Sequence, residues 1–352
     1  MRRAASSVVR GLLGATGTVE PVVLKGLAAA APAAVAAHNV GLFLQLHTRL
    51  PLLLQRSYTL GYESLGNSTT ASLKGRTILV TGSTDGIGKH TAALLAQQGA
   101  TVLVHGRARS KVQRTLRELR SHTGNPAVYG YCYDMASLGQ TRAFGEHLRR
   151  DLQQHFDGRL HCLINNAGVF NEELVMTEDG LEETWAVNVA SPFLLTALLT
   201  DLITDRIIDV SSISLADTLD WDNLQAEREY GRVGHAAYSQ SKLALNMWSF
   251  ALAARLHRAR HPAVVHCIDP GSAATKILLA GWGEVAHSVA TRAYEVSDLD
   301  WAVREPQLAK CTGKYYVNRK PRASAKFSYS LANQQRLWDL LVQQTGAEFT
   351  LG

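Results

Sequence analysis

Short runs of Val, Ile and Leu alternate with amphipathic segments from residue 74 onwards. The runs lack a polar alternation, as expected of strands that are covered on both faces of a parallel sheet. The predicted strands are residues 76–81, 101–105, 128–133, 160–165, 206–211, 263–268 and 314–317. The predicted helices lie near 87–98, 109–121, 137–155, 178–202 and 236–258. This alternation predicts an α/β fold: a doubly wound, mostly parallel seven-stranded sheet with helices on both faces.

The composition is typical of a folded chain and argues against a disulfide framework and a metal site. Of 352 residues, 46% are hydrophobic and 19% are charged, which is too apolar for a disordered protein. The four cysteines include no CxxC pair, so no disulfide framework is indicated. The thirteen histidines include no HExxH spacing, so the sequence predicts no metal site.

The positive charge is concentrated at the N-terminus. Six basic residues and one acidic residue lie in residues 1–62, so this segment carries +5 of the net charge of +6. The rest of the chain is nearly neutral. A general nucleic-acid-binding surface needs basic residues on the folded part, so no nucleic-acid partner is predicted.

The first 60 residues have features of targeting and of membrane contact. Residues 1–15 are basic and free of acids, which resembles a mitochondrial or other organelle-targeting segment. Residues 26–45 are uncharged over a bilayer-spanning length, but Pro32, His38 and Asn39 make insertion marginal. Three interpretations stay open: an Ala-rich leader with a docking helix, an organelle-targeting segment, or a membrane anchor. We therefore separate an N-terminal extension, 1–71, from a folded domain, 72–352.

Residues 81–88 read TGSTDGIG and lie between the first predicted strand and the first predicted helix. Gly82 permits a tight turn, Gly86 lets backbone amides approach a diphosphate, and Gly88 lets the helix pack closely on the sheet. The helix N-terminus adds unpaired amides and partial positive charge. In this strand–turn–helix context the glycines predict dinucleotide binding.

The second predicted strand is followed by Arg107, Arg109 and Lys111, with no acidic residue between Thr101 and Leu116. NAD sites usually carry an acid here for the ribose 2′-hydroxyl, whereas guanidinium groups pair with a 2′-phosphate. The pattern favours NADP(H) over NAD(H). The alternative is that the three cations lie on a solvated helix face.

Tyr238 and Lys242 lie four residues apart in a predicted helix, so their side chains share a face. A phenol with a pKa of about 10 is a poor acid at neutral pH, and a neighbouring ammonium lowers that pKa. Ser212 follows the fifth predicted strand and could hold a substrate oxygen. Ligands of parallel sheets bind at the carboxyl ends of strands, which is where Ser212 lies.

Six motifs occur together in a recognisable order. They are TGSTDGIG (81–88), NNAG (165–168), Asn188 in WAVNVASPF, VSS (210–212), YSQSK (238–242) and PGSAAT (270–275). Over residues 72–345 the chain resembles a single-domain, Rossmann-like short-chain dehydrogenase/reductase. The wide gap between Ser212 and Tyr238 and the stretches 313–321 and 337–341 resemble its retinol-dehydrogenase-like branch. Residues 61–64 and 319–321 resemble the "SDR family member 12" type of that branch.

The resemblance implies a catalytic tetrad of Asn188, Ser212, Tyr238 and Lys242. Tyr238 would deliver or accept the proton at the substrate oxygen, and Ser212 would hydrogen-bond that oxygen. Lys242 would tune Tyr238 and bind the nicotinamide ribose, and Asn188 would position a relay water. Members of this family often pair through the helices carrying Asn188 and Tyr238, so the resemblance is compatible with a homodimer.

The resemblance also implies a set of cofactor contacts. The phosphates would contact Gly82, Thr84, Gly86, Ile87 and Gly88, and the 2′-phosphate would contact Arg107. Adenine would lie at Asp134, and the ribose region would lie at Asn166, Gly168, Tyr238 and Lys242. The nicotinamide end would lie at Pro270, Gly271 and Thr275.

Three residues depart from the expected pattern. Asp85 stands where Ser is common, so we expect its carboxylate to point outward or to cap a backbone amide. Asp269 precedes Pro270 where an uncharged residue or His is more usual. Pro192 lies four residues after Asn188 in a predicted helix and predicts a local kink there.

Residues 215–235 and 277–300 are expected to form the substrate wall, the second as an apolar lid. The alternative is that their apolar residues pack on the core. The sequence thus predicts an NADP(H)-dependent oxidoreductase interconverting a carbonyl and an alcohol on a lipophilic substrate such as a retinoid, steroid or fatty aldehyde. The competing hypotheses are a catalytically silent nucleotide-binding protein and a membrane-docked regulatory protein that keeps the fold.

Overall fold

The computed structural model describes residues 72–351 apart from 229, 231–233, 272–276, 278–279 and 282–295. The predicted N-terminal extension, Thr275 and most of the predicted lid lie outside the described residues. The described residues form one sheet of order β3-β2-β1-β4-β5-β6-β7-β8, parallel throughout except for β7 with β8. The strands are β1 (Thr77–Val80), β2 (Thr101–Gly106), β3 (Val128–Cys132), β4 (Leu160–Asn165), β5 (Ile203–Val210), β6 (Val264–Asp269), β7 (Lys314–Val317) and β8 (Lys320–Arg322).

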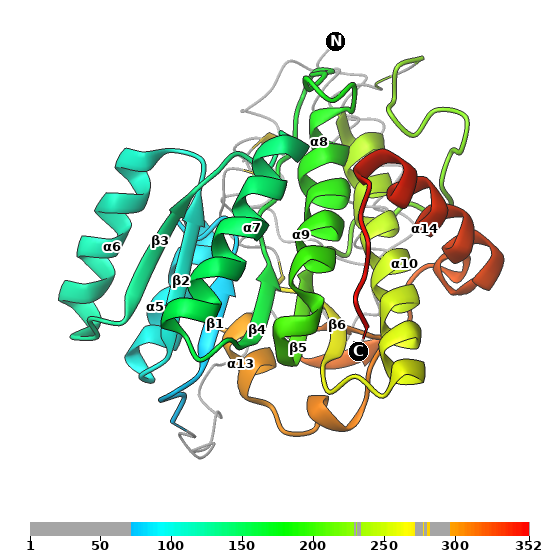
Figure 1. The fold of residues 1–352 in the computed structure, drawn as a ribbon. Helices are drawn as coiled ribbons and strands as arrows, with labels where there is room; N and C mark the ends of the chain where they lie inside the picture. Colours follow the sequence, from blue (N-terminus) through cyan, green and yellow to red (C-terminus); the bar gives the residue numbers. More distant parts are fainter. Residues whose placement is uncertain are drawn as a thin grey trace, which may run out of the picture. The chain divides into compact units, whose positions relative to one another are not determined.

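Helices cover both faces of the sheet, as the alternating pattern predicts. The helices are α5 (Gly86–Gln97), α6 (Arg109–Thr123), α7 (Leu138–His155), α8 (Glu183–Trp185), α9 (Ser191–Leu199), α10 (His235–Ala259), α13 (Asp298–Arg304) and α14 (Leu331–Thr345). One core cluster joins α7, α9, α10 and α14 to one face, and a second joins α5, α6 and α13 to the other. Figure 1 shows α7, α9 and α10 side by side across the first face. The Rossmann-like α/β prediction is confirmed.

The predicted number of strands is too low by one. Asn318 and Arg319 have φ of +50° and +60° and form a two-residue turn between β7 and the antiparallel strand β8. Positive φ at both central residues is the geometry of a tight hairpin turn. β8 is an exposed edge strand, where Pro321 is tolerated because no further strand needs its missing amide.

The helix predicted at 178–202 begins later and is irregular. Residues 176–182 form a turn closed by a bridge between Met176 and Glu182, and the helix starts at Glu183. A π-helical segment, Ala186–Ala190, precedes α9. Pro192 has no amide to donate to the Asn188 carbonyl, so regular α geometry is interrupted there, as Pro192 predicts.

Two helices were not predicted from the hydrophobic pattern. α13 begins at Asp298 inside the range expected to be a lid, yet Leu299, Ala302 and Val303 pack in the second core cluster. The end of that range is therefore core rather than lid. α14 packs Leu337 and Leu341 into the first core cluster.

One described stretch, Glu183–Leu202, has the length and apolar character of a membrane span. Because 83% of its apolar window is buried inside the fold, packing against neighbouring helices explains that character.

Candidate active site

The turn after β1 has no room for side chains at its key glycines. Gly82 has φ of +64°, and a Cβ added there would lie 2.8 Å from the Ala167 Cα. A Cβ added at Gly88 would overlap the Asn166 amide and lie 2.7 Å from the Gly82 carbonyl oxygen. The bare backbone of this turn leads into the N-terminus of α5, which fits the approach of a diphosphate.

Asp85 caps the helix that follows this turn. Its side chain is exposed, and its Oδ1 accepts a hydrogen bond of 2.9 Å from the Gly86 amide. This matches the expectation that the carboxylate caps a backbone amide. The capped amide belongs to a residue to which the resemblance assigns a phosphate contact.

Asn166 joins the end of β4 to the same turn. Its amide and that of Ala167 donate to the Thr81 hydroxyl at 3.0 and 2.9 Å, and its side chain donates to the Thr81 carbonyl at 2.8 Å. The resemblance implies that Asn166 lies near the ribose, and the structure adds that its side chain braces the turn. Ile87, also in the predicted phosphate set, packs on the second core cluster.

His105 is a positioning residue that the sequence did not reveal. It is 3% exposed at the end of β2, where its Nδ1 accepts from the Gly82 amide at 3.2 Å and its Nε2 lies 3.0 Å from the Tyr133 carbonyl. Burial lowers the pKa of His105 to about 4. A neutral imidazole therefore fixes the start of the glycine turn.

The cations predicted for a 2′-phosphate lie in solvent. Arg107 has 67% of its side chain exposed, with its guanidinium 3.9 Å from the Glu183 carboxylate. Arg109 and Lys111 are also exposed. Thr84 lies beside this region, since a Cβ added at Gly106 would lie 2.9 Å from its hydroxyl. The Glu183 contact joins residues far apart in sequence, and no local pattern signals it.

Asp134, predicted near adenine, lies in the loop after β3. Its Oδ1 accepts from the Ala136 amide at 3.0 Å, so the carboxylate shapes this loop.

Tyr238, Ser212 and Lys242 lie together at the carboxyl ends of the strands. α10 carries Tyr238 and Lys242 one turn apart, with the Lys242 Nζ 5.6 Å from the centre of the Tyr238 ring. Ser212 lies close enough to the Tyr238 hydroxyl to act on it and lower its pKa. Three of the predicted catalytic groups are thus brought together.

Burial raises the pKa of Tyr238 to about 12, and the nearby Ser212 side chain offsets part of that rise. The sequence predicted a lowered pKa, but burial of the phenol is the larger effect in the protein alone. The phenol is therefore protonated at neutral pH, which is the form a proton donor needs.

Lys242 is buried near two carboxylates. Its Nζ donates to the Val210 carbonyl at 2.9 Å. Burial lowers the pKa of Lys242 to about 8, while the carboxylates of Asp269 and Asp209 act to raise it. Asp209 is fully buried and accepts from the Asn165 side chain at 2.8 Å and the Ser249 hydroxyl at 2.7 Å.

Asn188 is 1% exposed and completes the predicted set. Its Oδ1 accepts from the Val169 amide at 2.9 Å, and its Nδ2 donates to the Val169 carbonyl and to the Ser241 hydroxyl at 3.1 and 3.0 Å. A Cβ added at Gly168 would lie 3.3 Å from the Asn188 Oδ1 and 3.7 Å from the Lys242 Nζ. Asn188 thus braces the chain after β4 against α10.

The surroundings of Tyr238 are aromatic and apolar. The Phe170 ring centre lies 5.3 Å from that of Tyr238 and 5.0 Å from that of His235. A Cβ added at Gly281 would lie 3.3 Å from Phe170, and the Ile277 side chain lies 3.8 Å from a Cβ added at Gly168. These two described positions of the predicted lid thus lie against the site.

The predicted turn at Pro270 and Gly271 follows β6. Gly271 has φ of +81° and donates its amide to the Asp269 carboxylate at 2.5 Å.

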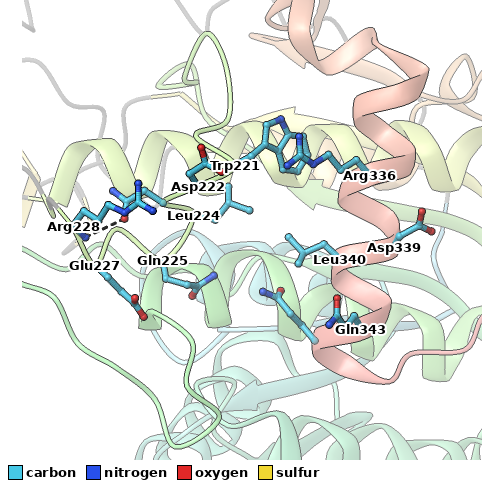
Figure 2. A pocket seen from close by; sticks show the side chains of 12 residues that line it. Trp221, Asp222, Leu224, Gln225, Glu227, Arg228, Arg336, Asp339, Leu340 and Gln343 are labelled. Carbon is cyan, nitrogen blue, oxygen red and sulfur yellow. Dashed lines mark hydrogen bonds between the residues drawn. The ribbon is translucent and has the colours of Figure 1, made fainter.

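A separate cavity of about 570 Å³ lies between residues 221–228 and α14. Figure 2 shows Arg336 stacked over Trp221 at one side and Leu340 facing Leu224. None of the predicted site residues lines this cavity. Part of the predicted substrate wall therefore faces α14.

Comparisons with known proteins agree with this arrangement. The profile of the short chain dehydrogenase family matches residues 76–280. Human polyprenol dehydrogenase is 32% identical over 293 residues, covering 77% of this chain and 85% of that protein. Human retinol dehydrogenase 13 is 31% identical over 299 residues, covering 79% and 87%.

Solved structures agree as well. An uncharacterised protein from Mycobacterium paratuberculosis has a TM-score of 0.65 at 26% identity, covering 79% of this chain and 96% of that one. A blue fluorescent protein from a metagenomic library, in complex with NADPH, has a TM-score of 0.56 at 25% identity, covering 72% and 100%. The chain belongs to the short-chain dehydrogenase/reductase family, in its retinol-dehydrogenase-like branch, and is an oxidoreductase of carbonyl and alcohol groups.

Proposed function

We propose that the protein uses NADP(H) to interconvert a carbonyl and an alcohol on a lipophilic substrate. The observation that carries the proposal is the buried Tyr238 phenol beside Ser212, with Lys242 one helical turn away. When bound, the nicotinamide group would supply or accept the hydride.

The residues of this chain have distinct tasks in the reduction. Ser212 hydrogen-bonds the substrate oxygen and orients it toward Tyr238. Tyr238 is protonated at neutral pH and gives its proton to that oxygen as negative charge develops there. The Lys242 ammonium stabilises the phenolate that remains. Asn188 keeps the chain after β4 in place beside these groups.

The bare glycine turn is a cradle that a side chain at Gly82 or Gly88 would fill, which supports a diphosphate there. Arg107, Arg109 and Lys111, exposed after β2, support a 2′-phosphate and so NADP(H). The NADPH complex of the metagenomic relative supports the same choice. Pro270 and Gly271 would lie at the nicotinamide end.

Two lines support a lipophilic substrate. The relatives are named for polyprenol and retinol, which are long apolar alcohols. In this chain Phe170 and Ile277 bring apolar surface to the catalytic residues. A long isoprenoid or alkyl chain could bury its apolar surface there.

Fluorescence titration with NADPH and NADH, followed by turnover, tests the proposal. The substrates are all-trans-retinaldehyde, a short polyprenal, decanal and acetaldehyde, with NADPH oxidation as the readout. We expect tighter binding of NADPH than of NADH and faster turnover of the three long aldehydes than of acetaldehyde. Binding of neither nucleotide, or turnover of acetaldehyde alone, would contradict the proposal.

The role of residues 1–60 stays a separate prediction. Fusion of residues 1–60 to a fluorescent reporter should direct it to mitochondria or to another membrane-bounded organelle. A uniformly distributed reporter would contradict both expectations.

A further inference from the structure

A buried carboxylate with no assigned role lies beside the candidate catalytic residues. Asp269 is the last residue of β6 and is 3% exposed. Its side chain accepts a hydrogen bond of 2.5 Å from the Gly271 amide, and the nearby Ile213 amide favours its ionised form. The carboxylate therefore lies between the turn after β6 and the backbone that directly follows Ser212.

The sheet register explains why Asp269 reaches the catalytic residues. Val210 pairs with Ile268, and the Ser211 amide donates to the Ile268 carbonyl at 2.8 Å. Asp269 therefore lies beside Ser211 and Ser212. The Lys242 Nζ donates to the Val210 carbonyl at 2.9 Å, which places the ammonium at the same pair of strand ends.

Two buried groups lie against the backbone at Ser212. The Tyr315 hydroxyl on β7 donates to the Ser212 carbonyl at 3.0 Å. The Asp269 carboxylate lies near the next amide along the chain, that of Ile213, which lowers the pKa of Asp269. The surroundings of the Ser212 hydroxyl thus include side chains from two neighbouring strands.

We propose that Asp269 is a positioning residue: its carboxylate holds the Pro270–Gly271 turn and sets a negative charge beside Lys242 and the Ser212 loop at the neighbouring strand end. Its significance for catalysis rests on the proposed function, because Lys242 then acts on Tyr238. Asp269 would touch neither substrate nor hydride.

The groups that face this carboxylate come from several elements. Lys242 and Tyr238 face it from α10, Asp298 from α13 and Tyr315 from β7. Asp209 on β5 and Cys267 on β6 act on the same Lys242. Among the described residues, Lys242 is the positively charged group that acts directly on Asp269. Arg319 instead pairs with Asp298, with 3.5 Å between the Arg319 Nε and the Asp298 Oδ1.

The net effect of Asp269 on the catalytic groups has one direction. Its negative charge raises the pKa of Lys242 and the pKa of Tyr238. Removing the charge should lower both, so that Lys242 loses its proton and Tyr238 becomes a phenolate at lower pH. Carbonyl reduction needs both protons in place, so both effects move the basic limb of its pH profile the same way.

The test measures the titration of Lys242 directly, in the full-length protein without added nucleotide. Lysine labelled with ¹³C at Cε is followed by NMR from about pH 6 to about pH 11. The Lys242 signal is assigned by its loss in Lys242→Arg. In Asp269→Asn we expect the Lys242 midpoint to fall by roughly one pH unit.

Asp298→Asn is the matched control. It neutralises another largely buried carboxylate, whose effect falls on Asp269 and not on Lys242. Because Asp269 is already ionised where Lys242 titrates, this control should leave the Lys242 midpoint in place. Asp269→Ser is a second neutral variant, and thermal melting checks the fold of each.

The second readout is kcat/KM for aldehyde reduction against pH. In Asp269→Asn its basic limb should move to lower pH by a similar amount. The Lys242 midpoint could fall in Asp269→Asn while the wild-type protein reduces no aldehyde. That result would uphold the action of the carboxylate on Lys242 and refute the proposed function. An unchanged Lys242 midpoint, or failure of both Asp269 variants to fold, would overturn the proposal.

Discussion

The glycine turn after β1 and the catalytic cluster at the ends of β5 and β6 lie on the same sheet but are held by different forces. The turn is fixed by missing side chains and by neutral donors and acceptors on His105, Asn166 and Thr81. The cluster contains buried ionisable groups, among them Lys242 and Asp269. The turn is thus specified by shape, whereas the cluster depends on a balance of charges that pH can alter.

The largest effect expected from this difference is in Tyr238→Phe. Loss of the proton donor should lower kcat by about 100- to 10,000-fold. The Kd of NADPH should change far less than kcat, because the variant removes at most one contact to the ribose and leaves the turn that would bind the phosphates untouched. Stopped-flow turnover and fluorescence titration measure the two quantities, and Tyr129→Phe, at an exposed site, is the matched control. Full activity in Tyr238→Phe would show that another group is the proton donor.

His105 tests whether the turn depends on a neutral group. Its folded pKa of about 4 lies below the ordinary histidine pKa of 6.5, so the neutral form stabilises the fold above pH 6.5. This stability is lost as pH falls from 6.5 through about 4. Protonation of His105 should lower the free energy of unfolding by about 3 kcal/mol in full.

Urea unfolding of wild type and His105→Gln at several pH values measures this contribution. Asp209 and Asp269 have raised pKa values near 6, so their protonation favours the folded state over an overlapping range. Both proteins contain Asp209 and Asp269, so the difference between their free energies of unfolding is independent of these two groups. This difference should shrink as the pH falls. A constant difference would mean that His105 does not titrate with unfolding.

Gly88→Ala tests the shape of the turn. The added Cβ meets Asn166 and the Gly82 carbonyl, so the turn must shift, at a cost of about 1–3 kcal/mol. NADPH affinity should fall by about 5- to 150-fold, because the shifted turn must regain its original shape to admit the nucleotide. Gly139→Ala is the control, since its Cβ would lie 3.6 Å from the nearest atom, Ser137 Oγ. Equal affinity in Gly88→Ala and wild type would contradict a close-fitting cradle.

The smallest effect concerns Arg107. Glu183→Gln removes the charge that faces its guanidinium, so NADPH should bind more tightly by about 1.5- to 5-fold while NADH is unaffected. Glu118→Gln, which neutralises an exposed glutamate paired with Lys89, should change neither affinity. Parallel changes for both nucleotides in Glu183→Gln would show that Arg107 does not select for the 2′-phosphate.

The sequence predicted features that depend on local chemistry. The Val- and Ile-rich runs identify the buried strands, and Gly82 and Gly88 identify the turn, because the backbone itself requires residues without a Cβ there. β8 was missed because its residues Lys320–Arg322 are exposed and carry no apolar pattern.

Features that depend on folding could not be predicted in the same way. Asp269 is visible as an unusual residue, but only the register of β5 and β6 shows that it lies beside Lys242. The raised pKa of Tyr238 follows from its burial, which a four-residue spacing to Lys242 does not encode. The contact between Arg107 and Glu183 joins separate elements in the same way.

The most direct test of the central claim follows the hydride itself. The protein is incubated with retinaldehyde and NADPH deuterated at C4, in the 4R and 4S forms separately, and the alcohol is analysed by mass spectrometry. The account predicts that one of the two forms places its deuterium on the carbinol carbon, at a rate that falls sharply in Tyr238→Phe. An alcohol without deuterium from either form, or no alcohol at all from any aldehyde, would contradict it.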